Sequence, residues 1–409
     1  MKAVILSIGT ELVSGQTVDT NSAYLSRELA GLGVETIAHA TVGDEQPAIA
    51  AAIREAAARA PLVLVTGGLG PTEDDLTRQA MAEVLGVALR LDARCLSQIE
   101  EFFRRREREM NPANRVQAML PAGAEPLDNP LGTAPGITAT VGQSRVYVMP
   151  GVPREMELMF AGQVAPRIGR SAGVVTHHIL HTFGQGESDI ASKIADLMQR
   201  GRNPLVGTTV AAGLVSVRVL TRAKDRSAAE KLARETIALL RDRLGELVVG
   251  EDDETMSPAV GMLLLSRGQT LATAESCTGG MIGEMLTAVA GSSRYYLGGV
   301  VAYANQAKTA LLGVAESLLA AHGAVSEPVA AAMAEGCRKR FASDWAVSVT
   351  GIAGPAGGTD EKPVGLVYIG LSGPDGTQVR RHILPGTRDI VRLRASLTAL
   401  NHLRLKLRR

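Results

Sequence analysis

Short apolar runs alternate with helical patterns over the first part of the chain. Nearly continuous apolar runs predict three buried strands, at Ala3–Ile8, Leu62–Thr66 and Arg145–Met149. Apolar residues three or four positions apart predict three helices, at Ser22–Gly31, Pro47–Ala60 and Arg154–Phe160. Because strands that alternate with helices are typical of a parallel sheet, we predict an α/β domain over residues 1–168.

The pattern changes after Thr176. Four strands are expected here, at His177–Phe183, Leu205–Val210, Val215–Thr221 and Glu246–Val249. Two helices, at Ser188–Met198 and Ser227–Leu244, and a turn at 211–213 separate them. The β-α-β-β-α-β order predicts a small ferredoxin-like α+β module over residues 174–250.

The last part of the chain returns to alternating strands and helices. The expected elements are helices at Pro258–Arg267 and Met281–Val289, and strands at Thr270–Ala274, Ala346–Val349 and Val364–Leu371. We therefore predict a third unit, an α/β domain, over residues 255–409. The charged run Arg104–Glu109 and the tail His402–Arg409 are interpreted as solvated helix faces.

Composition limits the classes of function. Among 409 residues, 43 are basic and 42 acidic, so no net field attracts nucleic acid or an anionic membrane. Aromatic residues make up 3% of the chain, too few for the stacking surface of a single-strand binder. No run approaches the ~20 apolar residues of a membrane span, and the apolar N-terminal run is shorter than a signal peptide. Since three widely spaced cysteines indicate neither disulfides nor a thiolate metal site, we expect a cytoplasmic enzyme acting on small molecules.

A glycine-rich turn follows the strand at Leu62–Thr66. The segment TGGLGPTEDDLT, residues 66–77, places Gly67, Gly68 and Gly70 before the start of a helix. Strand, glycine turn and helix together form a geometry that cradles phosphate with backbone N–H groups. The turn has neither the ending of a P-loop nor the spacing of a dinucleotide fingerprint. The alternative interpretation is an acidic helix start that satisfies free N–H groups.

Carboxylates from three loops are expected beside this turn. Glu11 follows the first strand, Asp44 precedes the second helix, and Asp75 closes the glycine turn. Loops at the carboxyl ends of parallel strands converge on one crevice. Because these carboxylates would repel a phosphate, we expect them to hold a divalent cation, Mg²⁺, Mn²⁺ or Co²⁺, that binds a nucleotide or pyrophosphate.

The first domain resembles the molybdopterin-binding domain of molybdenum-cofactor biosynthesis proteins. The resemblance rests on residues 8–21 and 66–77, in which Asp75 matches the functional Asp of the glycine loop. Asp44 resembles a second functional Asp of that family. Leu69 replaces the usual Thr of the loop.

This variant with Leu is similar to the CinA family instead. Two further segments carry that resemblance, NPLGTAPG at residues 129–136 and MPGVPREM at residues 149–156. The resemblance implies hydrolysis of ADP-ribose with a divalent metal at this domain, and pterin binding stays open as an alternative.

A serine at a second strand-to-helix turn is the candidate nucleophile. The segment AESCTGG, residues 274–280, lies between a predicted strand and a predicted helix. Such a turn presents the Ser276 hydroxyl together with an oxyanion hole formed by N–H groups around Thr278–Gly280. A Ser-His triad has weak support, since no Gly-x-Ser-x-Gly elbow is present. Cys277 is a competing nucleophile that we interpret as a buried structural thiol.

Lys308 is the candidate base for this serine. It ends the segment YANQAK, residues 303–308, in which Tyr303 and Asn305 are polar neighbours. Serine activated by lysine is an established variant of the catalytic triad. Burial and a cationic substrate can lower the lysine pKa from ~10.4 toward roughly 7–8, as a base requires. The alternative is that Ser276 caps a helix and Lys308 is solvated.

A glycine turn with the sequence TGIAGP, residues 350–355, completes a set of four motifs. With residues 274–280, residues 303–308 and GAVSEP at 323–328, it closely resembles the nicotinamide mononucleotide deamidase domain of CinA proteins. The resemblance implies Ser276 as nucleophile, with Lys308, Tyr303 and Thr278 as the other catalytic residues. The substrate-binding residues implied by the same motifs are Gly279, Gly280, Asn305, Thr350, Gly351 and Gly354.

The sequence thus predicts a nicotinamide mononucleotide amidohydrolase of NAD recycling. The deamidase domain is expected to need no cofactor, and the N-terminal domain to act as a metal-dependent ADP-ribose pyrophosphatase. Both ligands are nucleotides, no nucleic acid or membrane partner is expected, and the resemblance favours a homodimer. The alternative is a non-catalytic nucleotide-binding regulator in competence or the DNA damage response.

Overall fold

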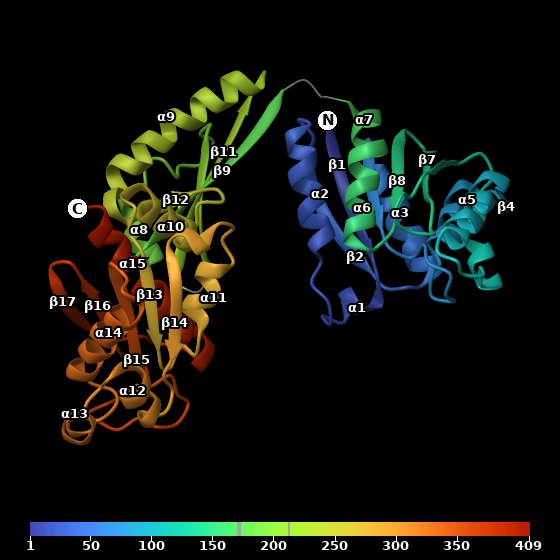
Figure 1. Ribbon diagram of the computed structural model, residues 1–409. Helices are drawn as coiled ribbons and strands as arrows, with labels where there is room; N and C mark the ends of the chain where they lie inside the picture. The colour runs from blue at the N-terminus through green and yellow to red at the C-terminus, as the bar shows by residue number, and fades with distance from the viewer. Residues whose placement is uncertain (170–172, 212) are drawn as a thin grey trace. The chain divides into compact units, whose positions relative to one another are not determined.

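The computed structural model describes residues 1–169, 173–211 and 213–409 (Figure 1). The chain forms two compact units, one of residues 1–176 with 221–231 and one of residues 177–220 with 232–409. In the described ranges, no helix has the length and hydropathy needed to cross a membrane.

A six-stranded sheet forms the centre of the N-terminal domain. Its strands lie in the order β2 (Glu35–Val42), β1 (Lys2–Ile8), β3 (Leu62–Thr66), β8 (Ser144–Met149), β7 (Gly136–Val141) and β6 (Glu125–Leu127). The first four are parallel, and β7 and β6 are antiparallel. Both faces of β1 are buried, since Val4 and Leu6 belong to one hydrophobic core and Ala3 and Ile5 to another.

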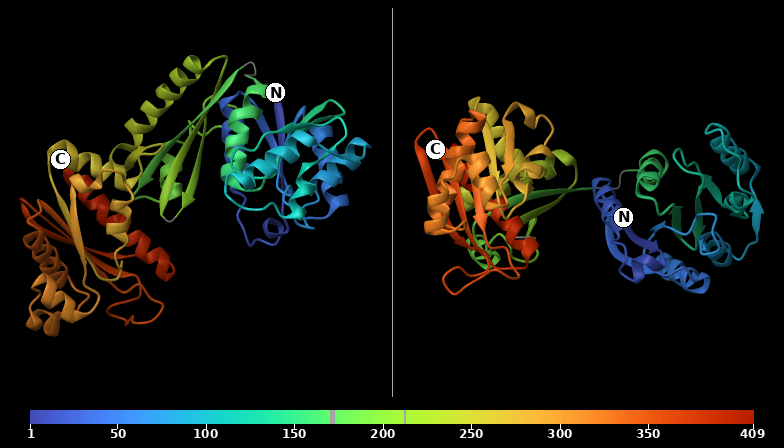
Figure 2. Two further views of the ribbon diagram at one scale, coloured as in Figure 1. Left: turned by 45° about the vertical axis from the view of Figure 1, so that its right-hand side comes forward. Right: turned by 60° about the horizontal axis from the view of Figure 1, so that its bottom comes forward.

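Helices cover both faces of this sheet (Figure 2). The core that contains Val4 is covered by α3 (Gln46–Arg59), α4 (Thr77–Leu85) and α5 (Ala93–Arg104), and the core that contains Ala3 by α2 (Thr20–Gly31) and α6 (Pro153–Met159). The shorter elements are α1 (Thr10–Val13), β4 (Leu89–Leu91), β5 (Met119–Pro121) and α7 (Ala165–Ile168). The predicted α/β architecture is confirmed. The helix face expected at Arg104–Glu109 is wrong, because α5 ends at Arg104 and the following residues form an exposed turn.

The middle module has the predicted β-α-β-β-α-β order. Its elements are β9 (Val174–Phe183), α8 (Glu187–Lys193), β10 (Leu205–Ala211), β11 (Leu214–Ala223), α9 (Arg226–Leu244) and β12 (Val248–Glu251). The sheet order is β10-β11-β9-β12, so the first strand lies beside the last, as in ferredoxin-like folds. Apolar residues of both helices and all four strands share one core. Residue 212 of the predicted turn lies outside the described residues.

The C-terminal domain is built on a five-stranded sheet. The strand order is β14 (Tyr296–Val301), β13 (Leu271–Glu275), β15 (Trp345–Gly351), β16 (Leu366–Gly373) and β17 (Gly376–Ile383). The first three are parallel and the last two antiparallel. One face packs on α10 (Met256–Arg267), α11 (Met281–Thr287) and α15 (Arg388–Leu407), and the other on α12 (Asn305–Leu312), α13 (Glu316–His322) and α14 (Glu327–Phe341). The third predicted α/β unit is confirmed.

The end of α15 is buried, so the expectation of a solvated tail is wrong. Leu403, Arg404 and Leu407 are each at most 1% exposed. Arg404 donates to the carbonyl oxygens of Val248 (2.8 Å) and Glu246 (2.5 Å), next to the start of β12. An arginine between apolar residues suggests a solvated side chain when only the sequence is known. In the structure, Arg404 instead forms hydrogen bonds with buried carbonyl groups of a distant segment.

Candidate functional site

The glycine turn after β3 lines a cavity of about 510 Å³ in the N-terminal domain. All six residues predicted for this site line it, namely Glu11, Asp44, Gly67, Gly68, Gly70 and Asp75. Thr133 and Glu155, from the two other motifs of this domain, lie on the same wall. The structure therefore brings together segments that lie far apart in the sequence, as expected for loops at one edge of a parallel sheet.

Backbone geometry explains why the turn needs glycine. Gly67 and Gly68 have φ angles of 103° and 65°, a region that other residues rarely adopt. A Cβ atom on Gly67 would clash with the carbonyl oxygen of Ile8, and one on Gly68 with the hydroxyl of Thr77. The turn thus packs directly on the end of β1 and the start of α4.

Arg78 stabilises this turn through hydrogen bonds, and it was not identified from the sequence. Its side chain is 1% exposed, and its guanidinium donates to the carbonyl oxygens of Leu69 and Gly70, both at 2.6 Å. Burial lowers the pKa of Arg78 to about 10, partly offset by the charge of Asp75. The guanidinium thus fixes two carbonyl groups of the glycine turn.

We expect Arg78→Met to destabilise the N-terminal domain by about 2–4 kcal/mol, because two buried carbonyl groups lose their partner. Urea unfolding followed by circular dichroism measures the change. The matched control is Arg94→Met, whose arginine is exposed and pairs with Asp128, and for which a loss below about 1 kcal/mol is expected. Equal losses for the two variants would contradict the role of Arg78.

Asp75 organises the glycine turn. One carboxylate oxygen accepts from the N–H of Gly70 (2.7 Å), and the other from the N–H (2.9 Å) and hydroxyl (2.5 Å) of Thr72. Asp44 accepts from the N–H of Thr10 at 2.7 Å. The two carboxylates are therefore held in fixed orientations by short backbone hydrogen bonds.

The donor set fits a divalent cation that shares its ligands with a substrate. Among the residues that the structure describes, the oxygens of Glu11, Asp44 and Asp75 do not all lie within 4.8 Å of one another, so they form no closed cage. Mg²⁺ is usually bound through one or two carboxylates and substrate phosphates, and hard oxygens in an open crevice suit this mode.

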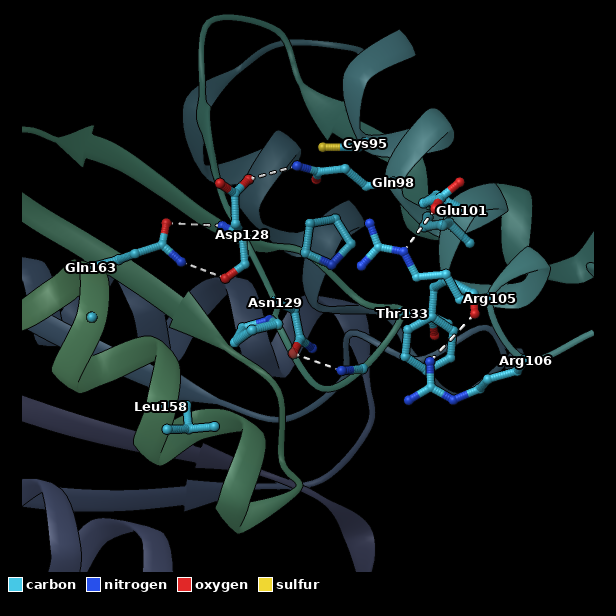
Figure 3. Close-up of a pocket in the computed structure, with 16 residues that line it drawn as sticks. Cys95, Gln98, Glu101, Arg105, Arg106, Asp128, Asn129, Thr133, Leu158 and Gln163 are labelled. Atoms are coloured by element: carbon cyan, nitrogen blue, oxygen red, sulfur yellow. Dashed lines mark hydrogen bonds and ion pairs between the residues drawn. The ribbon is translucent and has the colours of Figure 1, made fainter.

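A second cavity, of about 490 Å³, adjoins the first at Thr133 (Figure 3). Asn129 forms the wall between them, since its amide donates to Glu155 (2.7 Å) and accepts from the N–H of Gly132 (2.8 Å). Helix α5 contributes Phe102 to this cavity. The guanidinium carbon of Arg106 lies over the Phe102 ring, 3.6 Å from the ring centroid. The motif at residues 129–136 thus lies between an acidic cavity and one that is lined by Phe102 and by charged residues of both signs.

In the C-terminal domain, Ser276 and Lys308 are in contact. The lysine Nζ lies 3.2 Å from the serine Oγ, and it also donates to the carbonyl oxygens of Ala302 (2.9 Å) and Tyr303 (3.1 Å). Ser276 follows β13, and Lys308 lies in the first turn of α12, which follows β14. Because β13 and β14 are adjacent and parallel, their ends bring the two side chains together.

Burial changes the acid-base properties of this pair. Lys308 is 1% exposed and Ser276 8% exposed. Burial lowers the pKa of Lys308, although the Cys277 thiol opposes this shift. Burial raises the pKa of the Cys277 thiol to about 11, which makes it a poor nucleophile at neutral pH.

The backbone N–H groups of the turn after Ser276 differ in their hydrogen-bond partners. The N–H of Gly279 donates to the carbonyl oxygen of Ser276, and that of Gly280 to the carboxylate of Glu275. Within the described part of the chain, the N–H groups of Cys277 and Thr278 donate to no other residue. Of the oxyanion donors expected around Thr278–Gly280, the N–H groups of Gly279 and Gly280 already have acceptors within the turn.

The other predicted residues differ in burial and in hydrogen-bond partners. Tyr303 is 62% exposed, and its hydroxyl accepts from Arg388, so its carbonyl rather than its side chain contacts Lys308. Thr278 is fully buried with an unpartnered hydroxyl, and the Thr350 hydroxyl donates to the carbonyl oxygen of Ala324. Asn305 is exposed at the start of α12, and Gly354 takes a φ angle of 78° in the last glycine turn.

Three residues of this site were missed in the sequence. Glu275 is buried and accepts from the N–H groups of Gly280, Ile282 and Gly283, which fixes the turn. Arg388 donates to the carbonyl oxygen of Gly354, and Arg392 to that of Thr278. The signal available was the spacing of four between the two arginines, which places them on one face of α15.

Fold and sites together define a protein with a molybdopterin-binding-like α/β domain, a small α+β module and an α/β domain that carries a Ser-Lys pair. Residues 4–170 match the family "Probable molybdopterin binding domain", residues 177–250 the "Damage-inducible protein CinA KH domain", and residues 253–407 the "CinA C-terminal domain". The middle module is thus KH-like.

Relatives match over the whole length. The CinA-like protein of Gloeobacter violaceus is 47% identical over 409 residues, which cover 98% of this chain and 96% of that protein. The CinA-like protein of Geobacter sulfurreducens is 44% identical, with 100% and 99% covered. A crystal structure described as competence/damage inducible protein CihA from Agrobacterium tumefaciens is 41% identical, covers 38% of this chain and 94% of that chain, and has a TM-score of 0.36. The chain belongs to the CinA family.

Proposed function

We propose that the C-terminal domain hydrolyses the carboxamide of nicotinamide mononucleotide, giving nicotinic acid mononucleotide and ammonia. The observation that carries this proposal is the 3.2 Å contact between Ser276 Oγ and Lys308 Nζ, both buried. A buried lysine of lowered pKa in contact with a serine hydroxyl is the arrangement of a Ser-Lys amidohydrolase.

The contacts of Lys308 suit both of its protonation states. As an ammonium ion it has three hydrogens for three acceptors, the Ser276 hydroxyl and two carbonyl oxygens. As a neutral amine it keeps two hydrogens for the carbonyl oxygens and turns its lone pair to the serine O–H. The amine then takes the serine proton as Oγ attacks the carboxamide carbon.

The reaction proceeds through an acyl-enzyme. Oγ bonds to the carboxamide carbon, and the resulting oxyanion accepts from the N–H groups of Cys277 and Thr278. The protonated Lys308 returns its proton to the leaving nitrogen, which departs as ammonia. The neutral amine of Lys308 then deprotonates a water molecule, which attacks the ester carbon; the C–Oγ bond breaks, Lys308 returns the proton to Ser276 Oγ, and the acid is released.

The substrate phosphate is assigned to Arg388. Its guanidinium lies on the rim of the site, where it contacts the Gly354 carbonyl and the Tyr303 hydroxyl. Arginine suits a phosphate because its fork of N–H groups matches two phosphate oxygens. The positive pyridinium ring of the substrate would lower the pKa of Lys308 further, since like charges disfavour each other.

The test is ammonia release from nicotinamide mononucleotide by the purified full chain, with and without a chelator. We expect release that the chelator does not affect, because no step above uses a metal. Failure of correctly folded protein to release ammonia would eliminate the amidohydrolase and favour a nucleotide-binding regulator.

For the N-terminal domain we propose metal-dependent hydrolysis of the ADP-ribose pyrophosphate. A bound divalent cation would neutralise charge on the pyrophosphate. Asp44 and Glu11 are the residues proposed to hold it, while Asp75 and Arg78 keep the glycine turn in place for the phosphates. The adjoining cavity has room for a nucleoside, which can stack beside Phe102.

We expect Asp44→Asn to lower ADP-ribose hydrolysis at least about 100-fold, because a neutral amide is a weaker ligand for a divalent cation. Release of AMP in the presence of Mn²⁺ measures it. Nicotinamide mononucleotide deamidation by the same variant is the internal control and should not change. Hydrolysis at the parent rate would exclude Asp44 as a ligand, and binding of a pterin in preference to ADP-ribose would point to the alternative substrate.

A further inference from the structure

A cavity of about 580 Å³ lies in the second compact unit, where the KH-like module meets the C-terminal domain. The turn after β9, with Phe183 and Gln185, forms its module side together with Leu247. Strand β17 and helix α15 form its domain side. None of its lining residues belongs to the motifs of the two proposed catalytic sites, so a ligand there would serve another purpose.

Positive charge gathers on the domain side. Arg380 of β17 and Arg394 of α15 line the cavity, and Glu246 is the one acidic residue among those that line it in the described chain. The rings of His382 and His402 lie 5.0 Å apart on the same wall. Burial, followed by the charges of His382 and Arg380, lowers the pKa of His402 to about 3. The two arginines, with Glu246 as the one acidic residue beside them among the described residues, give the lining a net positive charge.

Two nitrogen atoms of this wall are buried without a hydrogen-bond partner. They are Nε2 of His382 and Nε of Arg394. The Arg394 side chain is nevertheless fixed, since it donates to the carbonyl oxygen of Pro385 at 2.7 Å. Both atoms are closed off from solvent, so a ligand in the cavity would be bound by other groups of the wall. An anion beside Arg380 and Arg394 would supply negative charge next to the two guanidinium groups.

The other residues that line the cavity favour an anion that also has an apolar organic group. Phe183, Leu247, Leu384 and Leu405 contribute apolar surface, and Asn401 adds an amide group. A volume of about 580 Å³ is in the range of cavities that hold small organic ligands, and far exceeds the needs of a free phosphate ion. Apolar surface with a few polar groups and a cationic end matches a nucleotide.

We propose that this cavity binds a nucleoside monophosphate, with its phosphate at Arg380 and Arg394 and its base against Phe183. Such a ligand would contact both the KH-like module and the C-terminal domain and hold them together. The proposal is independent of the two proposed reactions, because the cavity shares no residue with either site.

The experiment uses the full chain with AMP, nicotinic acid mononucleotide and inorganic phosphate as probes. Hydrogen–deuterium exchange locates binding, and we expect AMP to protect the amides of residues 183–186 and 380–384. Calorimetry then compares Arg380→Met with Arg381→Met, its exposed neighbour that does not line the cavity. We expect AMP affinity to fall at least tenfold for the first variant and to stay within twofold for the second.

Gln185→Trp provides a second variant, since Gln185 is an exposed residue of the rim and tryptophan would fill the cavity. A tenfold loss is expected there also. Parent affinity in both Arg380→Met and Gln185→Trp, or no protection in the two segments, would overturn the proposal. Phosphate that binds as tightly as AMP would overturn the assignment to a nucleotide and leave a site for an inorganic anion.

Discussion

Replacement of Ser276 by alanine is expected to lower kcat/KM for nicotinamide mononucleotide deamidation by a factor of about 10⁴ or more. The serine oxygen forms the covalent bond, and no neighbouring group can take its place. The Cys277 thiol, adjacent in sequence, is buried, and its pKa of about 11 keeps it protonated. Ammonia release with nicotinamide mononucleotide as the sole substrate measures the loss in kcat/KM.

Cys277→Ala is the matched control for this variant, since it removes a side chain of similar size from the next residue. It should keep activity within about fivefold of the parent, because a small buried thiol contributes only packing. An active Ser276→Ala enzyme together with an inactive Cys277→Ala enzyme would assign the nucleophile to the cysteine. Circular dichroism of both variants establishes that the domain is folded.

Lys308→Met is expected to lower kcat/KM by about 10³ and to change its dependence on pH. The base acts as the neutral amine, so the parent rate rises with pH until the lysine is deprotonated. Because burial lowers the pKa of Lys308, the rise should end below the ordinary value of 10.5. The rising limb should be absent from the profile of Lys308→Met.

Two further variants test whether Lys308 acts as a base or only supplies a positive charge. Lys308→Arg keeps the charge but loses a deprotonatable amine, so it should be as inactive as Lys308→Met. Lys339→Met, which replaces an exposed lysine of α14, should retain both the rate and the pH profile of the parent. A Lys308→Arg enzyme with near-parental activity would contradict the role of Lys308 as base.

Much of the fold was predictable because its strands are buried on both faces. Residues Leu62–Thr66 form a continuous apolar run, and the structure has β3 at the same residues. Strand β2 was not predicted, since none of its residues is fully buried and its sequence ETIAHATV has no continuous apolar run. Its pairing with β1 comes from the sheet, which local sequence patterns do not encode.

The candidate sites were likewise predictable only in part. Ser276 directly follows a strand, whereas Lys308 lies in the helix after the next strand. The order of elements alone left a helix cap and a solvated lysine open, and the family motifs favoured the pair. Arg388 reaches the same site from a helix more than a hundred positions after the serine, and only the packing of α15 shows this. Glu275 reads as the end of an apolar strand, and its three hydrogen bonds appear only once the chain turns back on it.

The pairing of β13 with β14 makes the contact between Ser276 and Lys308 sensitive to small shifts in the sheet. The carbonyl oxygen of Glu275 accepts from the N–H of Ala302 at 2.8 Å, one residue before the serine and six before the lysine. A slip of one residue between the strands would displace one side chain by about 3.3 Å relative to the other, as far as the present Ser-Lys contact is long. The proposed deamidation should therefore depend on the register of this pair of strands. In a denaturant titration, turnover should vanish as soon as the two strand ends separate, ahead of the loss of helical signal from the rest of the chain.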